Sequence, residues 1–84
     1  MKQVKVSLKI VGKWYEAKGK DYVSAVLKLK PEVAKGVGVL VMESGDLKRE
    51  RVLGAPLITS LFTPVSRMRK EIAVKQLKGM FEGL

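Results

Sequence analysis

The chain has 84 residues, which is enough for one hydrophobic core but not for two, so we expect a single domain over residues 1–84. It contains neither histidine nor cysteine, which excludes the commonest general base near neutral pH, the commonest zinc ligands and thiol nucleophiles. Lysine and arginine outnumber aspartate and glutamate by 17 to 8, and the resulting formal charge of +9 favours an anionic partner.

The first predicted element is a strand over residues 3–10, where apolar and polar residues alternate strictly. Gly12 can begin a two-residue turn of type II′, which prefers glycine in first place, and a second strand is then expected over residues 14–18. This register sets Ile10 opposite Tyr15 on the buried face. The sequence therefore predicts an N-terminal β-hairpin with one solvent-exposed face.

A short helix and a second hairpin are predicted next. Asp21 can cap a helix over residues 22–30, because Pro31 forbids normal continuation. Residues 37–42 are continuously apolar, which is typical of a central strand covered on both faces. Residues 47–53 hold four charged side chains, a density that suits an exposed edge of the sheet.

The rest of the chain is predicted to be mainly one long helix. Pro56 suggests one or two helical turns over residues 57–62. Thr63 and Pro64 then have the pattern of a cap and a first helical residue, opening an amphipathic helix that runs to about Glu82. Its apolar side would consist of Val65, Ile72, Ala73, Leu77, Met80 and Phe81. We expect an α+β fold, with a four-stranded, mainly antiparallel sheet in ββαββα order and a short and a long helix packed on one face.

The excess of positive charge belongs to the first hairpin and the final helix, because residues 36–54 balance to zero. In the predicted register, lysines and one tryptophan share the outer face of the hairpin, where ammonium groups can meet phosphates while the indole stacks on a base. A second basic cluster lies near the start of the final helix, where the helix dipole is already positive and an anion would relieve the repulsion. The predicted contacts for single-stranded DNA or RNA, with little base specificity, are Lys5, Lys9, Lys13, Trp14, Lys18, Arg67, Arg69 and Lys70.

Both clusters also have an ordinary structural explanation. Val11 and Trp14 can form a simple cross-strand pair, or another segment can cover this face while the lysines only keep the domain soluble. The cluster near the start of the helix can be a solvated turn that Glu71 partly neutralises. The sequence alone leaves these alternatives open.

A second hypothesis is a non-catalytic assembly protein, such as an accessory or structural subunit of a larger complex, a virion included. The basic surface would match an acidic neighbour, and a second copy of the chain is another possible partner. The residues predicted for this contact are Leu57, Leu61, Phe62, Met80 and Phe81. The same residues can instead cap the core and end the core helix, and periodicity does not separate the two.

We expect no catalytic residue, no metal site and no cofactor. Acidic residues are scattered singly apart from Glu43 near Asp46, and no serine has a histidine to activate it. The longest glycine-free apolar run, residues 39–42, is too short to cross a bilayer, and the alternating start of the chain is unlike a secretory signal. We therefore expect a non-enzymatic protein in the cytoplasm, or in a virion under the second hypothesis, without a membrane partner.

Overall fold

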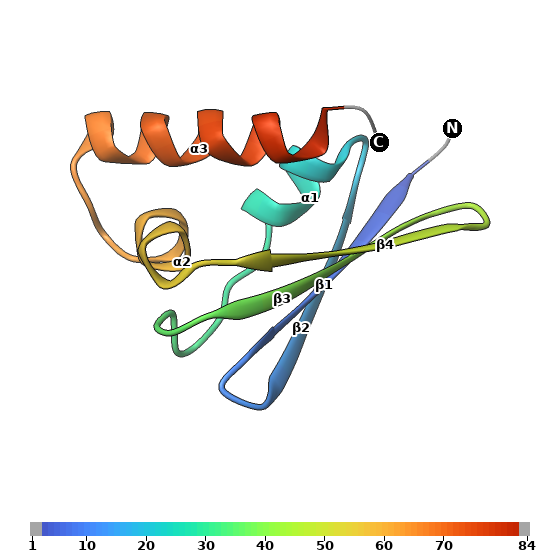
Figure 1. Cartoon of the computed structure of the whole chain (residues 1–84), viewed down its shortest axis with the longest axis horizontal. Helices are drawn as coiled ribbons and strands as arrows, with labels where there is room; N and C mark the ends of the chain where they lie inside the picture. Colours follow the sequence, from blue (N-terminus) through green and yellow to red (C-terminus); the bar gives the residue numbers. More distant parts are fainter. Residues whose placement is uncertain (1–2, 83–84) are drawn as a thin grey trace.

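The computed structural model describes residues 3–82 and shows two layers, a four-stranded sheet and three helices on one of its faces (Figure 1). The α+β fold is confirmed, and the short helical segment before the final helix is a helix of its own. The strands are β1 (Val4–Ile10), β2 (Lys13–Gly19), β3 (Gly38–Ser44) and β4 (Leu47–Leu53). The helices are α1 (Tyr22–Leu27), α2 (Ala55–Phe62) and α3 (Arg67–Phe81).

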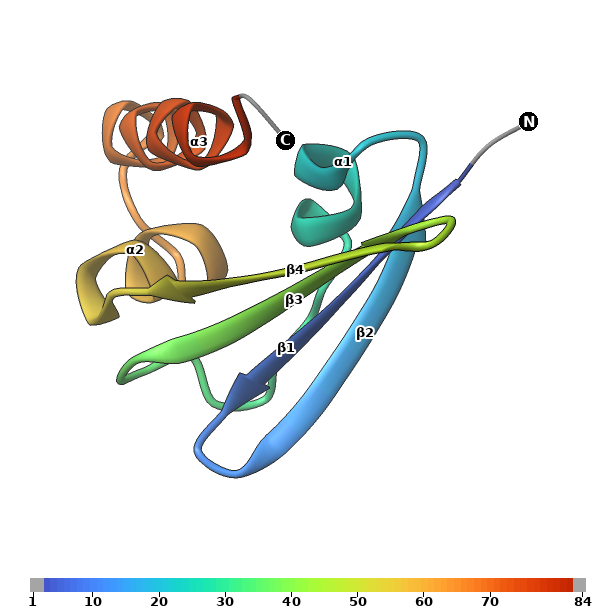
Figure 2. The same ribbon diagram turned by 45° about the vertical axis from the view of Figure 1, so that its right-hand side comes forward.

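The strands lie in the order β2-β1-β3-β4, and every neighbouring pair is antiparallel. The apolar segment that contains β3 is therefore a central strand, and the charged strand β4 is an edge, as the sequence predicts. Figure 2 shows that all three helices lie on the same side of the twisted sheet. The expectation that β3 is covered on both faces is wrong, because within residues 3–82 the helices leave its second face open.

The first hairpin turns one residue earlier than predicted. Its turn residues are Val11 and Gly12, with φ angles of 49° and 77°, and two positive φ angles are characteristic of a type I′ turn. Leu8 consequently pairs with Tyr15, which the sequence pattern set opposite Ile10. Because the difference in register is two residues, every side chain keeps its predicted face.

One face of the sheet and the inner sides of the helices form a single hydrophobic core. A glycine lets α2 approach the central strands: a Cβ atom at Gly38 would lie 3.0 Å from the Cδ1 atoms of both Ile58 and Leu8. A side chain there would therefore require the ends of these two side chains to shift within the core. The buried core residues are Val6, Leu8, Ile10, Ala25, Val26, Leu29, Leu40, Met42, Leu53, Ile58, Leu61, Ala73 and Leu77.

The start of α1 is capped as the sequence predicts. The carboxylate of Asp21 accepts a hydrogen bond of 2.7 Å from the backbone nitrogen of Ser24, which satisfies one of the free N–H groups of the first turn. The helix ends at Leu27, earlier than the predicted end near residue 30. A connector over residues 28–37 then leads to β3.

The predicted start of the long helix is wrong. Thr63 ends α2, and its hydroxyl donates a hydrogen bond of 2.5 Å to the carbonyl oxygen of Thr59. Ser66 instead caps α3, because its hydroxyl oxygen accepts a hydrogen bond of 3.2 Å from the backbone nitrogen of Arg69. Both Thr63 and Ser66 are good cap residues, so the local pattern alone does not choose between them.

The buried side of α3 is narrower than the predicted apolar side. Ala73 and Leu77 are buried, whereas the side chain of Ile72 is 53% exposed. Met80 and Phe81 are partly buried and pack against the core. With three helices sharing one face of a small sheet, α3 contacts α1 and α2 along a narrow stripe and leaves Ile72 outside it.

Candidate functional site

Alternate residues of the four strands project from the uncovered side of the sheet and form three rows, which together we call the open face. The pairing of the strands sets the members of each row side by side. The first row is Lys18, Lys5, Glu43 and Lys48; the second is Glu16, Ser7, Val41 and Glu50; the third is Trp14, Lys9, Val39 and Val52.

Trp14 and Lys9 form a pair at one end of the open face. They lie directly opposite each other on β2 and β1, and the ammonium of Lys9 is 5.9 Å from the centre of the indole. The side chain of Trp14 remains 56% exposed. A cation beside an exposed indole is attracted by about 0.5–1 kcal/mol, so this contact favours keeping charge and ring together.

Lys5 lies in the first row, at the other end of the open face, and is already paired. Its Nζ atom is 3.1 Å from the carboxylate of Glu16. The hydrogen bond and the charge of Glu16, and more weakly the charge of Glu43, raise the pKa of the Lys5 ammonium above its usual 10.5. Part of the positive charge of Lys5 is therefore offset before any ligand arrives.

Glutamates balance most of the charge of the open face. Four lysines share it with Glu16, Glu43 and Glu50, so its net charge is only +1. The predicted register, with Ile10 opposite Tyr15, also places Glu16 on this face, but sequence reasoning missed Glu43 and Glu50. Their signal was available in the spacing: Glu43 is two residues from Val41, and Glu50 is two residues from Lys48, so each shares its neighbour's face. The sequence does not show which face of β3 and β4 lies beside the lysines of the first hairpin.

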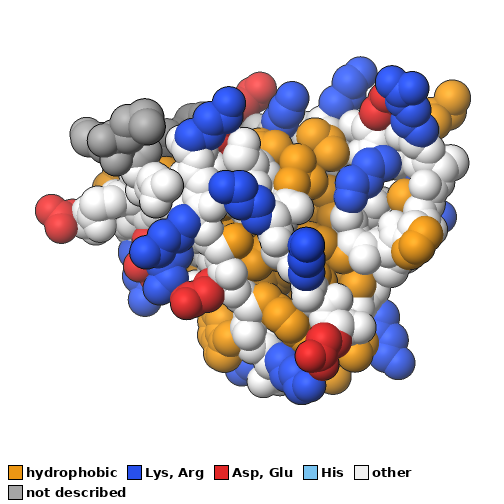
Figure 3. Space-filling model, turned by 180° about the vertical axis from the view of Figure 1, so that it is seen from behind, with side chains coloured by type: hydrophobic (Ala, Val, Ile, Leu, Met, Phe, Trp, Pro, Cys, Tyr) orange, Lys and Arg blue, Asp and Glu red, His pale blue; other side chains and the backbone are white. Residues whose placement is uncertain are grey.

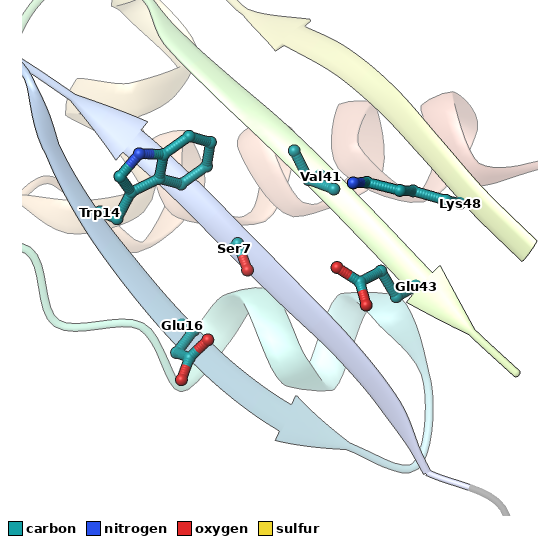
Figure 4. A pocket seen from close by; sticks show the side chains of 6 residues that line it. All are labelled: Ser7, Trp14, Glu16, Val41, Glu43 and Lys48. Atoms are coloured by element: carbon teal, nitrogen blue, oxygen red, sulfur yellow. The ribbon is translucent and has the colours of Figure 1, made fainter.

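A shallow depression of about 390 Å³ lies in the centre of the open face (Figure 4). Trp14 stands at one end, Glu43 and Lys48 stand at the other, and the helices lie behind the sheet. Val41 is only 6% exposed, although it lies on the face opposite the three described helices, because the longer side chains around it exclude solvent. The depression thus offers an aromatic wall, an aliphatic floor and polar groups of both signs.

Two predicted contact residues of the first hairpin differ in their placement. Lys18 is exposed in the first row of the open face. Lys13 pairs with Ile10, so it belongs to the face that the helices cover, and its ammonium lies 3.3 Å from the carboxylate of Glu32 in the connector. The structure therefore brings Lys5, Lys9, Trp14 and Lys18 together and separates Lys13 from them.

The predicted cluster on α3 lies on the other side of the sheet and makes contacts of its own. Arg67 pairs with Glu71 at 3.2 Å. The Nε atom of Arg69 donates a hydrogen bond of 3.1 Å to the hydroxyl of Ser60, and Lys70 donates one to the carbonyl oxygen of Leu61. Arg69 and Lys70 thus attach the start of α3 to α2. The two basic clusters predicted from the sequence do not form one surface.

The residues predicted for protein assembly lie in or against the core. Leu61 is buried, and the other four are partly buried and pack on the core. Phe81 stacks obliquely on Tyr22, with 5.6 Å between the ring centres. The large apolar side chains that are well exposed are different ones, including Val11, Trp14 and Val52 at one end of the open face. The five residues predicted for assembly therefore do not form a free apolar stripe, and the exposed apolar side chains on α3 are Met68 and Ile72 instead.

Two further properties concern the chemistry available to residues 3–82. They contain no group of three or more acidic side chains placed to hold a metal ion. None of their helices combines the length and the apolar composition needed to cross a membrane.

Comparison of the chain with models of known protein families, with characterised proteins and with solved structures gives no match.

Proposed function

We propose that this protein binds single-stranded nucleic acid on the open face, with little base specificity. A base stacks on Trp14, and phosphates contact the ammonium groups of Lys9, Lys5 and Lys18. The observation that supports this proposal is the half-exposed indole of Trp14 beside the ammonium of Lys9, on the sheet face that the helices of residues 3–82 leave uncovered. Aromatic rings next to cations on an open sheet are a common way to hold single strands.

The geometry limits how a strand can lie on this face. Lys5 and Lys9 are four residues apart on β1, which corresponds to about 13 Å along the strand, so they contact different phosphates. The row between them contains Glu16 and Glu50, which repel phosphate. The nucleic acid therefore has its strongest contact at the Trp14–Lys9 end. Charge elsewhere on the protein adds long-range attraction without choosing a sequence.

The binding experiment is a titration of Trp14 fluorescence with oligothymidylate. Trp14 is the only tryptophan, so its emission reports on this site alone. We expect quenching at low salt and an affinity that falls as salt rises. For three phosphate contacts, the slope of log K against log salt is about −2. An emission spectrum that does not respond at low salt, or an affinity that stays constant between about 50 and 200 mM salt, contradicts the proposal.

A further inference from the structure

A groove lies on the helix side of the molecule, between the end of α1 with its connector and the junction of α2 and α3. Its volume is about 360 Å³, which falls within the range of ordinary ligand sites. The apolar part of its lining includes Leu27, Leu29, Leu61 and Phe62, and the basic part consists of Lys30 and Lys70. Within the described part of the chain, no acidic side chain lines it.

The apolar wall is open to solvent at one point. Leu29 and Leu61 are buried, but Leu27, the last residue of α1, is 42% exposed. In the rear view of Figure 3, which faces the connector, a hydrophobic strip lies between basic side chains. An exposed leucine at the edge of a groove provides apolar surface that a second chain can bury when it binds there.

The two lysines are held differently. Lys70 is half-buried, and its ammonium donates a hydrogen bond to the carbonyl oxygen of Leu61 near the end of α2, so its position is fixed. Lys30 is exposed and makes no hydrogen bond or ion pair within residues 3–82. One cation is thus preorganised, and the other is free to reach a carboxylate.

The distribution of charge supports an acidic occupant of this side. Among residues 3–82, the open face holds four basic and three acidic side chains. The edges and the helix side hold the other twelve basic side chains and only five acidic ones, a net charge of +7. Most of the attraction for anions is therefore remote from the open face.

We propose that this groove binds an acidic peptide segment of a partner protein. A hydrophobic side chain of the segment seats against Leu27 and Phe62, while flanking carboxylates pair with Lys30 and Lys70. The lining favours a peptide over a nucleic acid, because its one aromatic ring, Phe62, is partly buried against the core and the leucine and proline side chains offer no ring on which a base can stack. The protein would then hold a nucleic acid on one side and a protein on the other.

The probe for this groove is a labelled peptide of about twelve residues, with two adjacent leucines flanked by aspartates and glutamates. We expect it to bind at low salt with a Kd below about 1 mM, measured by fluorescence anisotropy. In two-dimensional amide NMR spectra it shifts the signals of Leu27, Lys30 and Lys70 and leaves those of Trp14 and Lys9 in place. Absence of binding at about 1 mM, or shifts confined to the open face, overturns the proposal.

Matched variants separate the groove from general electrostatics. Lys30→Glu and Lys35→Glu both reverse one exposed lysine of the connector, but only Lys30 lines the groove. We expect Lys30→Glu to weaken peptide binding at least about tenfold and Lys35→Glu less than about twofold. Equal losses for the two variants mean that only net charge matters, which contradicts a defined site.

Two variants that each shorten an exposed apolar side chain complete the test. Leu27→Ala removes the exposed anchor of the groove, and Ile72→Ala removes an apolar side chain outside it that is somewhat more exposed. We expect Leu27→Ala alone to weaken the peptide, by about three- to tenfold. Trp14→Leu leaves peptide binding unchanged, so failure of the nucleic-acid proposal and failure of this one are distinguishable. Oligothymidylate is then added to the complex. If it displaces the peptide and shifts the amide NMR signals of Leu27 and Lys30, the groove binds nucleic acid and the peptide proposal is overturned.

Discussion

The ammonium of Lys9 lies 5.9 Å from the centre of the Trp14 indole, which is directly opposite it on β2. The predicted register, with Ile10 opposite Tyr15, would have set Lys9 opposite Glu16 instead. The two-residue difference in register therefore changes the partner of Lys9 from a carboxylate to an aromatic ring. A lysine beside an indole keeps its full charge available to a phosphate, whereas a lysine paired with glutamate does not.

The Trp14–Lys9 pair is expected to dominate binding to oligothymidylate. Trp14→Leu removes the stacking surface, which contributes about 1–3 kcal/mol per base. The affinity, measured by anisotropy of a labelled oligonucleotide, should therefore fall roughly five- to 150-fold. Lys9→Gln removes a charge instead and should reduce the magnitude of the salt slope by about 0.7.

The control for both variants is Lys35→Gln, which removes an exposed lysine of the connector, outside the rows of the open face. The affinity of Lys35→Gln for oligothymidylate should stay within about twofold of that of the parent protein, because only long-range attraction changes. If Lys35→Gln weakens the oligonucleotide as much as Lys9→Gln does, binding does not depend on the open face.

The turn of the first hairpin can be improved by one substitution. Val11 has a φ angle of 49°, which costs a β-branched residue about 1 kcal/mol or more, and its side chain is 65% exposed. Val11→Asn creates Asn-Gly, the preferred pair for a type I′ turn. We expect about 1 kcal/mol more stability and a melting temperature about 4–8 °C higher, measured by circular dichroism.

The matched change at the next position should act in the opposite direction. Gly12 has a φ angle of 77°, and a Cβ there meets no other atom within 4 Å, so Gly12→Ala introduces backbone strain without a clash. It should lower the melting temperature. A rise after Gly12→Ala, or a fall after Val11→Asn, would mean that the hairpin does not turn at these two residues.

The cap of α1 predicts a dependence of stability on pH. Hydrogen bonds from Ser24, and more weakly the charges of Lys20 and Lys78, hold the pKa of the Asp21 carboxyl below its ordinary 3.8. A group whose pKa is lower in the folded state stabilises the fold above its unfolded pKa and loses that effect as the pH falls. The contribution of Asp21 should thus be complete near neutral pH and disappear below 3.8.

Asp21→Asn keeps the capping oxygen but removes the charge, so it isolates this effect. We expect its melting temperature to lie below that of the parent protein near neutral pH and to approach it near pH 2. A difference between the two proteins that is the same at both pH values would show that the charge of Asp21 plays no part.

Much of the fold was predictable because it depends on local patterns. Strict alternation over residues 3–10 identifies β1 and its buried side, and Asp21 before an apolar segment identifies the start of α1. The turn was harder, since Val11 is an unusual residue for a positive φ angle and the glycine that follows it fits either position of the turn. Two acceptable caps three residues apart, Thr63 and Ser66, made the start of α3 ambiguous in the same way.

The candidate sites were less predictable because they join residues that are far apart in the chain. Glu43 and Glu50 reach the open face only because β3 pairs with β1, and that pairing spans the whole of α1 and its connector. The groove likewise combines residues 27, 29–31, 61–64 and 70. Local periodicity gives the face of each element, but which faces meet is decided by long-range packing.

Arg69 provides a test of whether the basic cluster of α3 contacts nucleic acid or holds the fold together. Its Nε atom donates a hydrogen bond of 3.1 Å to Ser60, whose side chain is buried. Arg69→Ala should leave that hydroxyl without this partner and destabilise the protein by about 1–2 kcal/mol in urea unfolding, because buried polar groups need hydrogen bonds. Oligothymidylate affinity should change less than about threefold, since α3 and the open face lie on opposite sides of the sheet. Arg67→Ala, which removes a similar charge from a more exposed position, should leave stability nearly unchanged. A large loss of affinity without a loss of stability in Arg69→Ala would instead place the start of α3 in the nucleic-acid interface.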